Sequence, residues 1–140
     1  MSSKTALITG VGPGTGSALA RRFAAGGYQV AMLARNGERL AALQAEVAGS
    51  RAFACELTDP IALAAALDSV VADMGSPSVV VHNAVGGAFG NFLDIDPAVL
   101  ERNFQVNVMA LLHLARHLAP AMVANGEGAI VVTGNTSALR

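Results

Sequence analysis

The sequence predicts an α/β fold in which a parallel, doubly wound sheet carries helices on both faces. Short apolar runs alternate with segments of helical periodicity along the 140 residues, and strands joined through helices of this length require crossovers that keep them parallel. Hydrophobic residues make up 53% of the chain and charged residues 14%, a composition typical of many buried elements. The run Val79–His82 is nearly continuous in β-branched residues, which indicates a strand covered on both faces.

The first half of the chain alternates three strand-like runs with two helical patterns. Leu19 and Phe23 lie four residues apart, the spacing of one helix face. Asn36 has a side chain suited to capping the next helix. The predicted order is a strand over Thr5–Thr9, a helix over Thr15–Ala25, a strand over Gln29–Leu33, a helix carrying Leu40, Leu43 and Val47, and a strand over Arg51–Cys55.

The second half continues the alternation. Asp59 and Pro60 have the residue types of an N-cap and a first helical position, and Pro97 opens a long apolar-periodic segment. The predicted order is a helix carrying Leu63, Leu67, Val70 and Met74, the strand Val79–His82, a helix from Pro97 to the Asn125-Gly126 pair, and a strand over Gly128–Thr133.

Length and composition indicate one domain over residues 1–140. The net charge of −1 gives no attraction to nucleic acid or to an anionic membrane. Cys55 is the single cysteine, which excludes an internal disulfide and favours a reducing, cytoplasmic setting. The most apolar segment, 106–124, contains Asn107, His113 and Arg116, so we expect no membrane span. The first residues have no signal-peptide pattern.

The most informative segment runs from Thr9 to Gly16, where a strand-like run leads through four glycines into a helical pattern. Gly10 can form the sharp turn, Gly14 lets the backbone approach a pyrophosphate, and Gly16 allows close packing of the helix on the sheet. Helix N–H groups and the helix dipole favour an anion there. We therefore expect Gly12 and Thr15 to join these glycines in binding phosphate. The alternative is an ordinary glycine-rich loop without a ligand.

The segment after the second strand indicates which dinucleotide binds. A site that prefers NAD carries an acidic residue near this position for the ribose hydroxyls, but the chain has Arg35 and Asn36. A guanidinium can pair with a 2′-phosphate through two hydrogen bonds. The chemistry favours NADP over NAD, with Arg35 and Asn36 as contacts. The alternative is that Arg35 is a solvated residue that caps the next helix.

Several motifs in order resemble the short-chain dehydrogenase/reductase family. Thr9, Gly10, Gly14 and Gly16 fit T-G-x-x-x-G-x-G. The family's Asn-Asn-Ala-Gly corresponds to His82-Asn83-Ala84-Val85, in which Asn83 and Ala84 match, and Asn107 falls within a V-N-V stretch. The resemblance implies a Rossmann-like fold. The family's strand order of 3-2-1-4-5-6-7 also implies that the chain is truncated after the fifth strand, leaving the apolar run 130–132 on an unpaired edge.

The resemblance also implies roles for matched residues. Glu56 and Leu57 stand where the family has an Asp-initiated motif that accepts from the adenine amino group, and Glu56 either reaches that group or points into water. The matched Asn83 would tie neighbouring strands together, and the small Ala84 would leave room for adenosine. Asn107 corresponds to the residue that holds a proton-relay water, or it serves only inside a helix seam.

At the catalytic end the resemblance weakens. The family template places Asn135 where a carbonyl-orienting serine belongs, with Thr136 and Ser137 following; we select Ser137 as the catalytic candidate beside Asn107. The family's Tyr-x-x-x-Lys motif does not occur within the 140 residues, and Tyr28 is the single tyrosine. The resemblance thus implies an NADP-dependent oxidoreductase that transfers hydride between nicotinamide and a carbonyl or alcohol. The alternative is a truncated or degenerate module that binds NADP(H) without turnover.

Three histidines offer further chemistry. We interpret His82 as structural in preference to catalytic. His113 and His117 lie four residues apart, a spacing that metal ligands use, but no third ligand is evident and we expect no metal. The partners implied by the resemblance are a small carbonyl or alcohol substrate and a second copy of the chain, in a dimer or tetramer formed through the long helix.

Overall fold

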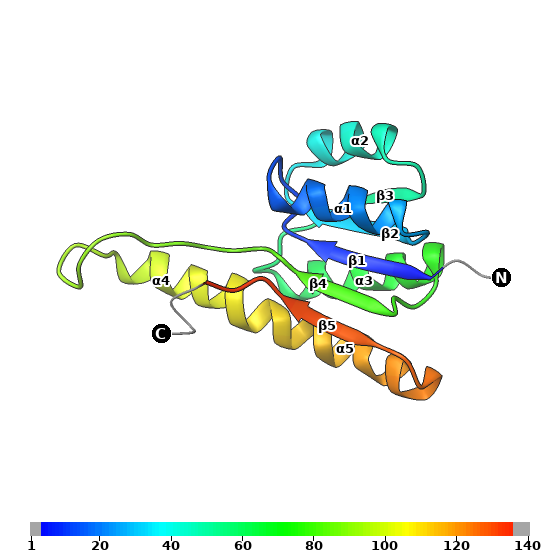
Figure 1. The fold of residues 1–140 in the computed structure, drawn as a ribbon. Helices are drawn as coiled ribbons and strands as arrows, with labels where there is room; N and C mark the ends of the chain where they lie inside the picture. Colours follow the sequence, from blue (N-terminus) through cyan, green and yellow to red (C-terminus); the bar gives the residue numbers. More distant parts are fainter. Residues whose placement is uncertain (1–3, 136–140) are drawn as a thin grey trace.

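The computed structural model describes residues 4–135. Within them, five parallel strands form one sheet in the order β3-β2-β1-β4-β5 (Figure 1). This confirms the predicted parallel, doubly wound fold, because the chain moves outward from β1 first on one side and then on the other. The strands are β1 (Thr5–Thr9), β2 (Gln29–Ala34), β3 (Ser50–Ala54), β4 (Val79–His82) and β5 (Ala129–Val132).

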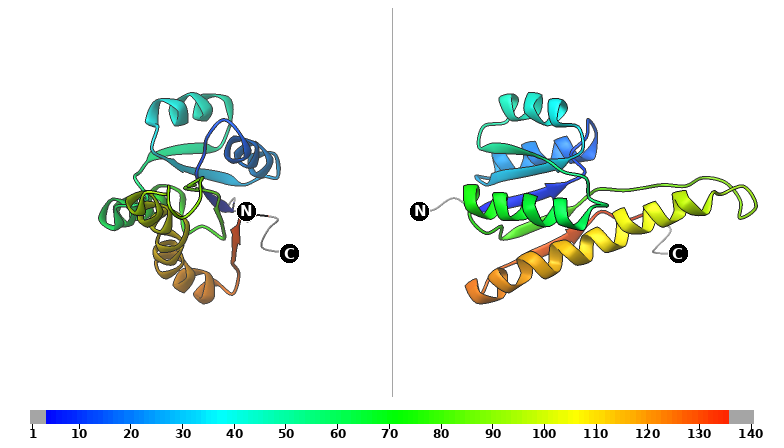
Figure 2. Two further views of the ribbon diagram at one scale, coloured as in Figure 1. Left: turned by 90° about the vertical axis from the view of Figure 1, so that its left-hand side faces the viewer. Right: turned by 180° about the vertical axis from the view of Figure 1, so that it is seen from behind.

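Helices cover both faces of the sheet, as the two rotated views in Figure 2 show. One face packs Ile8 and Met32 against Leu40 and Leu43, and the other packs Leu7 and Leu33 against α3 and α5. The central strand β1 is buried along its whole length, which explains its apolar sequence. The helical segments are α1 (Thr15–Ala25), α2 (Gly37–Glu46), α3 (Pro60–Met74), α4 (Pro97–Phe104), η1 (Gln105–Met109) and α5 (Ala110–Asn125).

Side-chain caps start three of the helices where the sequence placed such residues. Asn36 Oδ1 accepts from the Arg39 N–H at 2.9 Å. Asp59 accepts from the N–H groups at the start of α3, and Asp96 does the same for α4. These bonds satisfy N–H groups that have no acceptor inside the helix. The prediction that Asn36 caps α2 is confirmed, and this role does not belong to Arg35.

Some boundaries differ by one residue from the sequence prediction. Strand β3 ends at Ala54, so Cys55 follows the strand and does not form its last residue. Helix α2 ends at Glu46 with Val47 as its C-cap residue, although Val47 is still buried. Both shifts occur at element ends, where the hydrogen-bond pattern frays and hydrophobic periodicity gives no sharp limit.

The long helix predicted from Pro97 is interrupted by a π-helical turn, η1. Together the three segments span 97–125 and form the only described helix whose length and mean hydropathy of 1.3 would suffice to cross a membrane. Leu114 and Leu118 of α5 lie buried in the core that includes α3. One face of α5 therefore belongs to the core, although only 22% of the most apolar window of the long helix is buried.

Strand β5 is the outer strand of the described sheet. Its residues are all exposed, and Ile130, Val131 and Val132 have 38%, 48% and 49% of their surface accessible. The expected apolar edge is therefore present in the described residues. Strand β5 still pairs in register with β4, with Ile130 beside Val80.

Candidate cofactor-binding site

A cleft of about 1300 Å³ opens at the carboxyl ends of the strands. This is where ligands bind in open α/β sheets, beside the strand at which the chain changes direction. The volume exceeds that of an ordinary small-molecule pocket and suits an extended ligand. The cleft brings together all eleven residues predicted to bind the cofactor, together with Asn107: Gly10, Gly12, Gly14, Thr15, Gly16, Arg35, Asn36, Glu56, Leu57, Asn83, Ala84 and Asn107.

The glycines of the turn are required for different reasons. Gly10 has a φ of +68°, and a Cβ there would lie 2.5 Å from the Ala84 Cα. A Cβ on Gly16 would lie 2.4 Å from the Gly10 carbonyl oxygen, so Gly16 lets α1 approach the turn at the end of β1 closely. Gly12 and Gly14 have open space where a Cβ would point, which leaves the surface of the turn free for a ligand.

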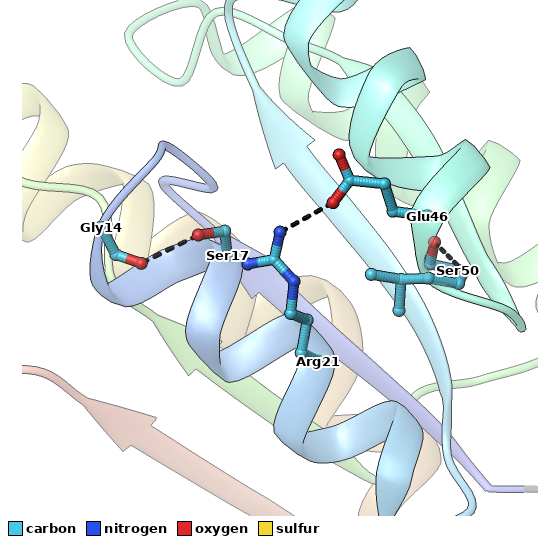
Figure 3. A network of polar contacts seen from close by, with 6 residues as sticks. Gly14, Ser17, Arg21, Glu46 and Ser50 are labelled. Carbon is cyan, nitrogen blue, oxygen red and sulfur yellow. Dashed lines mark hydrogen bonds and ion pairs between the residues drawn. The ribbon is translucent and has the colours of Figure 1, made fainter.

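The N-terminus of α1 faces this cleft without a side-chain cap, and its first turn contains no acidic residue. Ser17 Oγ donates to the Gly14 carbonyl at 3.0 Å (Figure 3). The Ser17 N–H donates to the Gly12 carbonyl at 3.1 Å. These bonds fix the shape of the turn from its carbonyl side. The arrangement fits a pyrophosphate, because the helix dipole favours an anion where no carboxylate competes.

Thr9 and Asn83 join the glycine turn to the end of β4. Thr9 Oγ1 accepts from the N–H groups of Asn83 and Ala84, each at 3.2 Å. Asn83 Nδ2 donates to the Gly10 carbonyl at 3.1 Å. Asn83 therefore ties β4 to the end of β1, which is the structural part of the role that the resemblance implied.

Positive charge gathers at the end of the cleft formed by the β2–α2 loop. Arg35 and Arg39 both line the cleft and are exposed. Asn36 also lines it, but its side-chain oxygen is engaged by the Arg39 N–H. Sequence reasoning identified Arg35 and missed Arg39, which stands one helical turn beyond the expected motif. This end of the cleft therefore presents two guanidinium groups, which suit an anion.

The Glu56 carboxylate has two hydrogen-bond partners within the protein. Its Oε1 accepts from the Thr58 N–H and its Oε2 accepts from Arg102, each at 3.2 Å. Burial acts to raise the pKa of Glu56, but the Thr58 hydrogen bonds and the charges of Arg102 and Arg35 lower it below its ordinary value. The carboxylate is therefore a partner of α4, a contact that no sequence pattern indicated.

Asn107 lies in η1, and its amide pairs with one backbone residue. Its Oδ1 accepts from the Gly86 N–H at 2.8 Å and its Nδ2 donates to the Gly86 carbonyl at 3.0 Å. Of the two alternatives left by the sequence, this geometry supplies a structural role for the side chain: it holds the loop after β4 against the helix.

His82 and Cys55 are the buried titratable groups beside the cleft. Burial lowers the pKa of His82 below its ordinary value, although a hydrogen bond to the Val106 carbonyl opposes this. Burial, followed by the charges of Glu56 and Asp59, raises the pKa of the Cys55 thiol. His82 is thus held neutral and Cys55 is held as an unreactive thiol.

Of the residues predicted at the catalytic end, one falls within the described part of the chain. Asn135 lines the cleft, whereas Thr136 and the catalytic candidate Ser137 lie outside the described residues.

His117 of α5 pairs with a residue of α3: its Nε2 lies 3.0 Å from Asp68 Oδ1. No group of three or more His, Cys, Asp or Glu residues within 4–135 could hold a metal ion.

The chain matches known proteins along almost its whole length. The family model for the short chain dehydrogenases matches residues 4–140. The chain is 32% identical to the 7alpha-hydroxysteroid dehydrogenase of Escherichia coli K12, over 99% of this chain and 55% of the relative. It is 33% identical to the D-erythrulose reductase of Gallus gallus, over 98% and 54%. It thus spans about half the length of these curated relatives.

Solved structures share the fold. A metagenomic short-chain oxidoreductase in complex with NADP superposes with a TM-score of 0.88 at 34% identity, over 94% of this chain and 62% of that chain. A 3-ketoacyl-(acyl-carrier-protein) reductase from Brucella melitensis complexed with NADH gives 0.89 at 29% identity, over 96% and 58%. The family match, the fold and the order of the motifs agree: the chain belongs to the short-chain dehydrogenase family.

Proposed function

We propose that the cleft binds NADP(H) and that the protein is an NADP-dependent oxidoreductase acting on a small carbonyl or alcohol. The glycine turn would hold the pyrophosphate at the N-terminus of α1. Arg35 and Arg39 would receive the 2′-phosphate, and the region of Asn107 and Asn135 would surround the nicotinamide. When bound, the cofactor would supply or accept the hydride. The observation that carries the proposal is the pair of arginines beside the uncapped helix in one cleft.

The residues of the chain would contribute orientation and exclusion of water. The bonds from Asn83 to Gly10 and from Asn107 to Gly86 fix the two backbone segments between which the cofactor would lie. When these two segments are rigid before the cofactor binds, less conformational entropy is lost on binding, and the reacting carbons are more easily aligned. We retain Asn107 as the candidate for holding a relay water. Because its side-chain amide is bound to Gly86, the water would be held by backbone groups of the same helical turn. Ser137 remains the candidate for orienting the substrate.

The cofactor preference is tested by fluorescence titration of the protein with NADPH and with NADH. We expect NADPH to bind at least about tenfold more tightly, the effect of one well-placed charge-assisted pair. Equal affinities would contradict the NADP assignment while leaving the family intact. Oxidation of NADPH with a panel of aldehydes and ketones then distinguishes an oxidoreductase from a module that binds without turnover.

We also propose that the protein forms a dimer or tetramer through the long helix. Five large apolar residues of α4, η1 and α5 are between 43% and 57% exposed: Val99, Leu100, Phe104, Val108 and Leu112. An apolar row of this kind favours association. Light scattering should give a multiple of the monomer mass, and Leu112→Glu should shift it toward the monomer; a monomer for the unsubstituted protein would overturn the proposal.

A further inference from the structure

His82 is a buried residue beside the cleft, and the proposed function has not used its hydrogen bonds. It ends β4, at a position where the family pattern has asparagine, and only 1% of its surface is exposed. Its ring joins two elements: Nδ1 lies 2.9 Å from Thr9 Oγ1 in β1, and Nε2 lies 3.0 Å from the Val106 carbonyl in η1.

The partners determine where the protons lie. A carbonyl oxygen can only accept, so Nε2 carries the hydrogen that it donates to Val106. In the neutral ring Nδ1 is then an acceptor, and Thr9 Oγ1–H donates to it. The Thr9 oxygen in turn accepts from the N–H groups of Asn83 and Ala84. The hydrogen bonds therefore all run in one direction, from the Asn83 and Ala84 N–H groups through Thr9 and His82 to the Val106 carbonyl. A second ring proton, on Nδ1, would remove the acceptor to which the Thr9 hydroxyl donates.

The Val106 carbonyl lies in the π-helical turn and accepts from a side chain outside the helix. In an α-helix it would accept from the N–H of Ala110, four residues later. In η1 the Ala110 N–H donates instead to the Gln105 carbonyl, five residues back. The Nε2–H of His82 is thus a donor to a carbonyl that the Ala110 N–H does not serve in this register.

The same turn carries Asn107, the next residue after Val106. A π-helical turn inserts one extra residue and so changes which side chains face the strand ends. In this register the Asn107 amide meets both backbone groups of Gly86. Losing the π-helical turn would rotate Asn107 away from Gly86 and release the loop that lines the cleft.

We propose that His82 is a positioning residue: as the Nε2–H tautomer fixed by Thr9, it holds η1 in the register that directs Asn107 to Gly86. The inference rests on the proposed function only in treating Asn107 as part of an active site. The contacts themselves do not depend on any cofactor, so their test is made without one.

The first test is the tautomer of His82 in the unsubstituted protein. Two-dimensional NMR of ¹⁵N-histidine-labelled protein should show one neutral ring with hydrogen on Nε2. Because burial lowers the pKa of His82 from 6.5, the neutral ring should persist below that pH. A ring protonated on Nδ1 alone, a mixture of tautomers, or an imidazolium at pH 6.5 would overturn the proposal.

Two substitutions distinguish the contact with Val106 from the contact with Thr9. When its side chain takes the path of the histidine ring, the amide of His82→Gln lies where Nε2 was and still donates to Val106. The shorter side chain of His82→Asn reaches only the place of Nδ1, where it can still accept from Thr9. Hydrogen exchange of the Asn107 side-chain amide and of the Ala110 N–H should accelerate about fivefold or more in His82→Asn, the value of one net hydrogen bond. In His82→Gln the change should stay within about twofold.

The matched controls are His113→Asn and His113→Gln on the partly exposed face of α5, which should leave both exchange rates unchanged. Equal rates in the two His82 variants would overturn the inference, since a ring that only fills space would not distinguish the two amides. If His82→Asn does not fold, the tautomer measurement and the His82→Gln exchange still decide. A failure of NADPH to bind would count against the proposed function and not against this result.

Discussion

Gly10→Ala is expected to destabilise the protein by about 2–5 kcal/mol, a large part of the roughly 5–15 kcal/mol that holds a domain folded. The residue has a φ of +68°, a conformation in which a Cβ is strained. The added Cβ would also lie 2.5 Å from the Ala84 Cα and nitrogen, which are backbone atoms that cannot rotate away. Urea unfolding followed by circular dichroism measures the loss.

Gly14→Ala is the matched control, because it makes the same chemical change in the same turn. Nothing lies within 4 Å of a Cβ placed there, so Gly14→Ala should destabilise the protein much less than Gly10→Ala does. Under the proposed function it should nevertheless weaken NADPH binding, since the methyl group would occupy the surface the phosphates approach. Equal destabilisation by the two substitutions would contradict the account of the turn.

Arg35→Ala is expected to abolish most of the preference for NADPH. Removing one guanidinium from a phosphate site costs about 1.5–3 kcal/mol, or roughly tenfold to a hundredfold in affinity. The affinity for NADH, which lacks the 2′-phosphate, should change much less. Titration of the variant with both cofactors measures the ratio directly.

Two further substitutions test whether the loss of NADPH preference is specific to Arg35. Arg51→Ala removes a guanidinium from the other end of β3, where it pairs with Asp73 at 3.2 Å, and should leave the ratio unchanged. Arg39→Ala should reduce the preference by a smaller factor, since Arg39 lines the same cleft but lies one helical turn farther from the end of β2. A preference that survives in Arg35→Ala would remove Arg35 from the proposed phosphate site.

The fold and the glycine turn could be predicted because each depends on local patterns. The apolar runs of β1 and β4 identified central strands, and Asn36, Asp59 and Pro97 marked helix starts that the structure confirms. Spacing alone placed the glycines, since a turn from strand to helix has few backbone solutions.

The contacts that span the cleft could not be predicted. Arg102 and Glu56 are 46 residues apart and His82 and Val106 are 24 apart, and no periodicity relates such pairs. The π-helical turn was also missed, because Gln105–Met109 keeps the composition of an ordinary helix. The donor that His82 supplies to the Val106 carbonyl in this turn comes from β4, and such a contact exists only in the tertiary structure.

The pairing of β1 with β4 has a consequence for how the chain forms as it is synthesised. Thr9 aligns with His82, so one side of the central strand stays unpaired until more than seventy further residues have been synthesised. Until then β1 can pair only with β2, and the apolar surface that β4 will cover stays open to water. Bringing such distant segments together is slow compared with forming a helix or adjacent strands. We therefore expect the pairing of β1 with β4, which completes the sheet beneath the cleft, to form later than the pairing of β1 with β2.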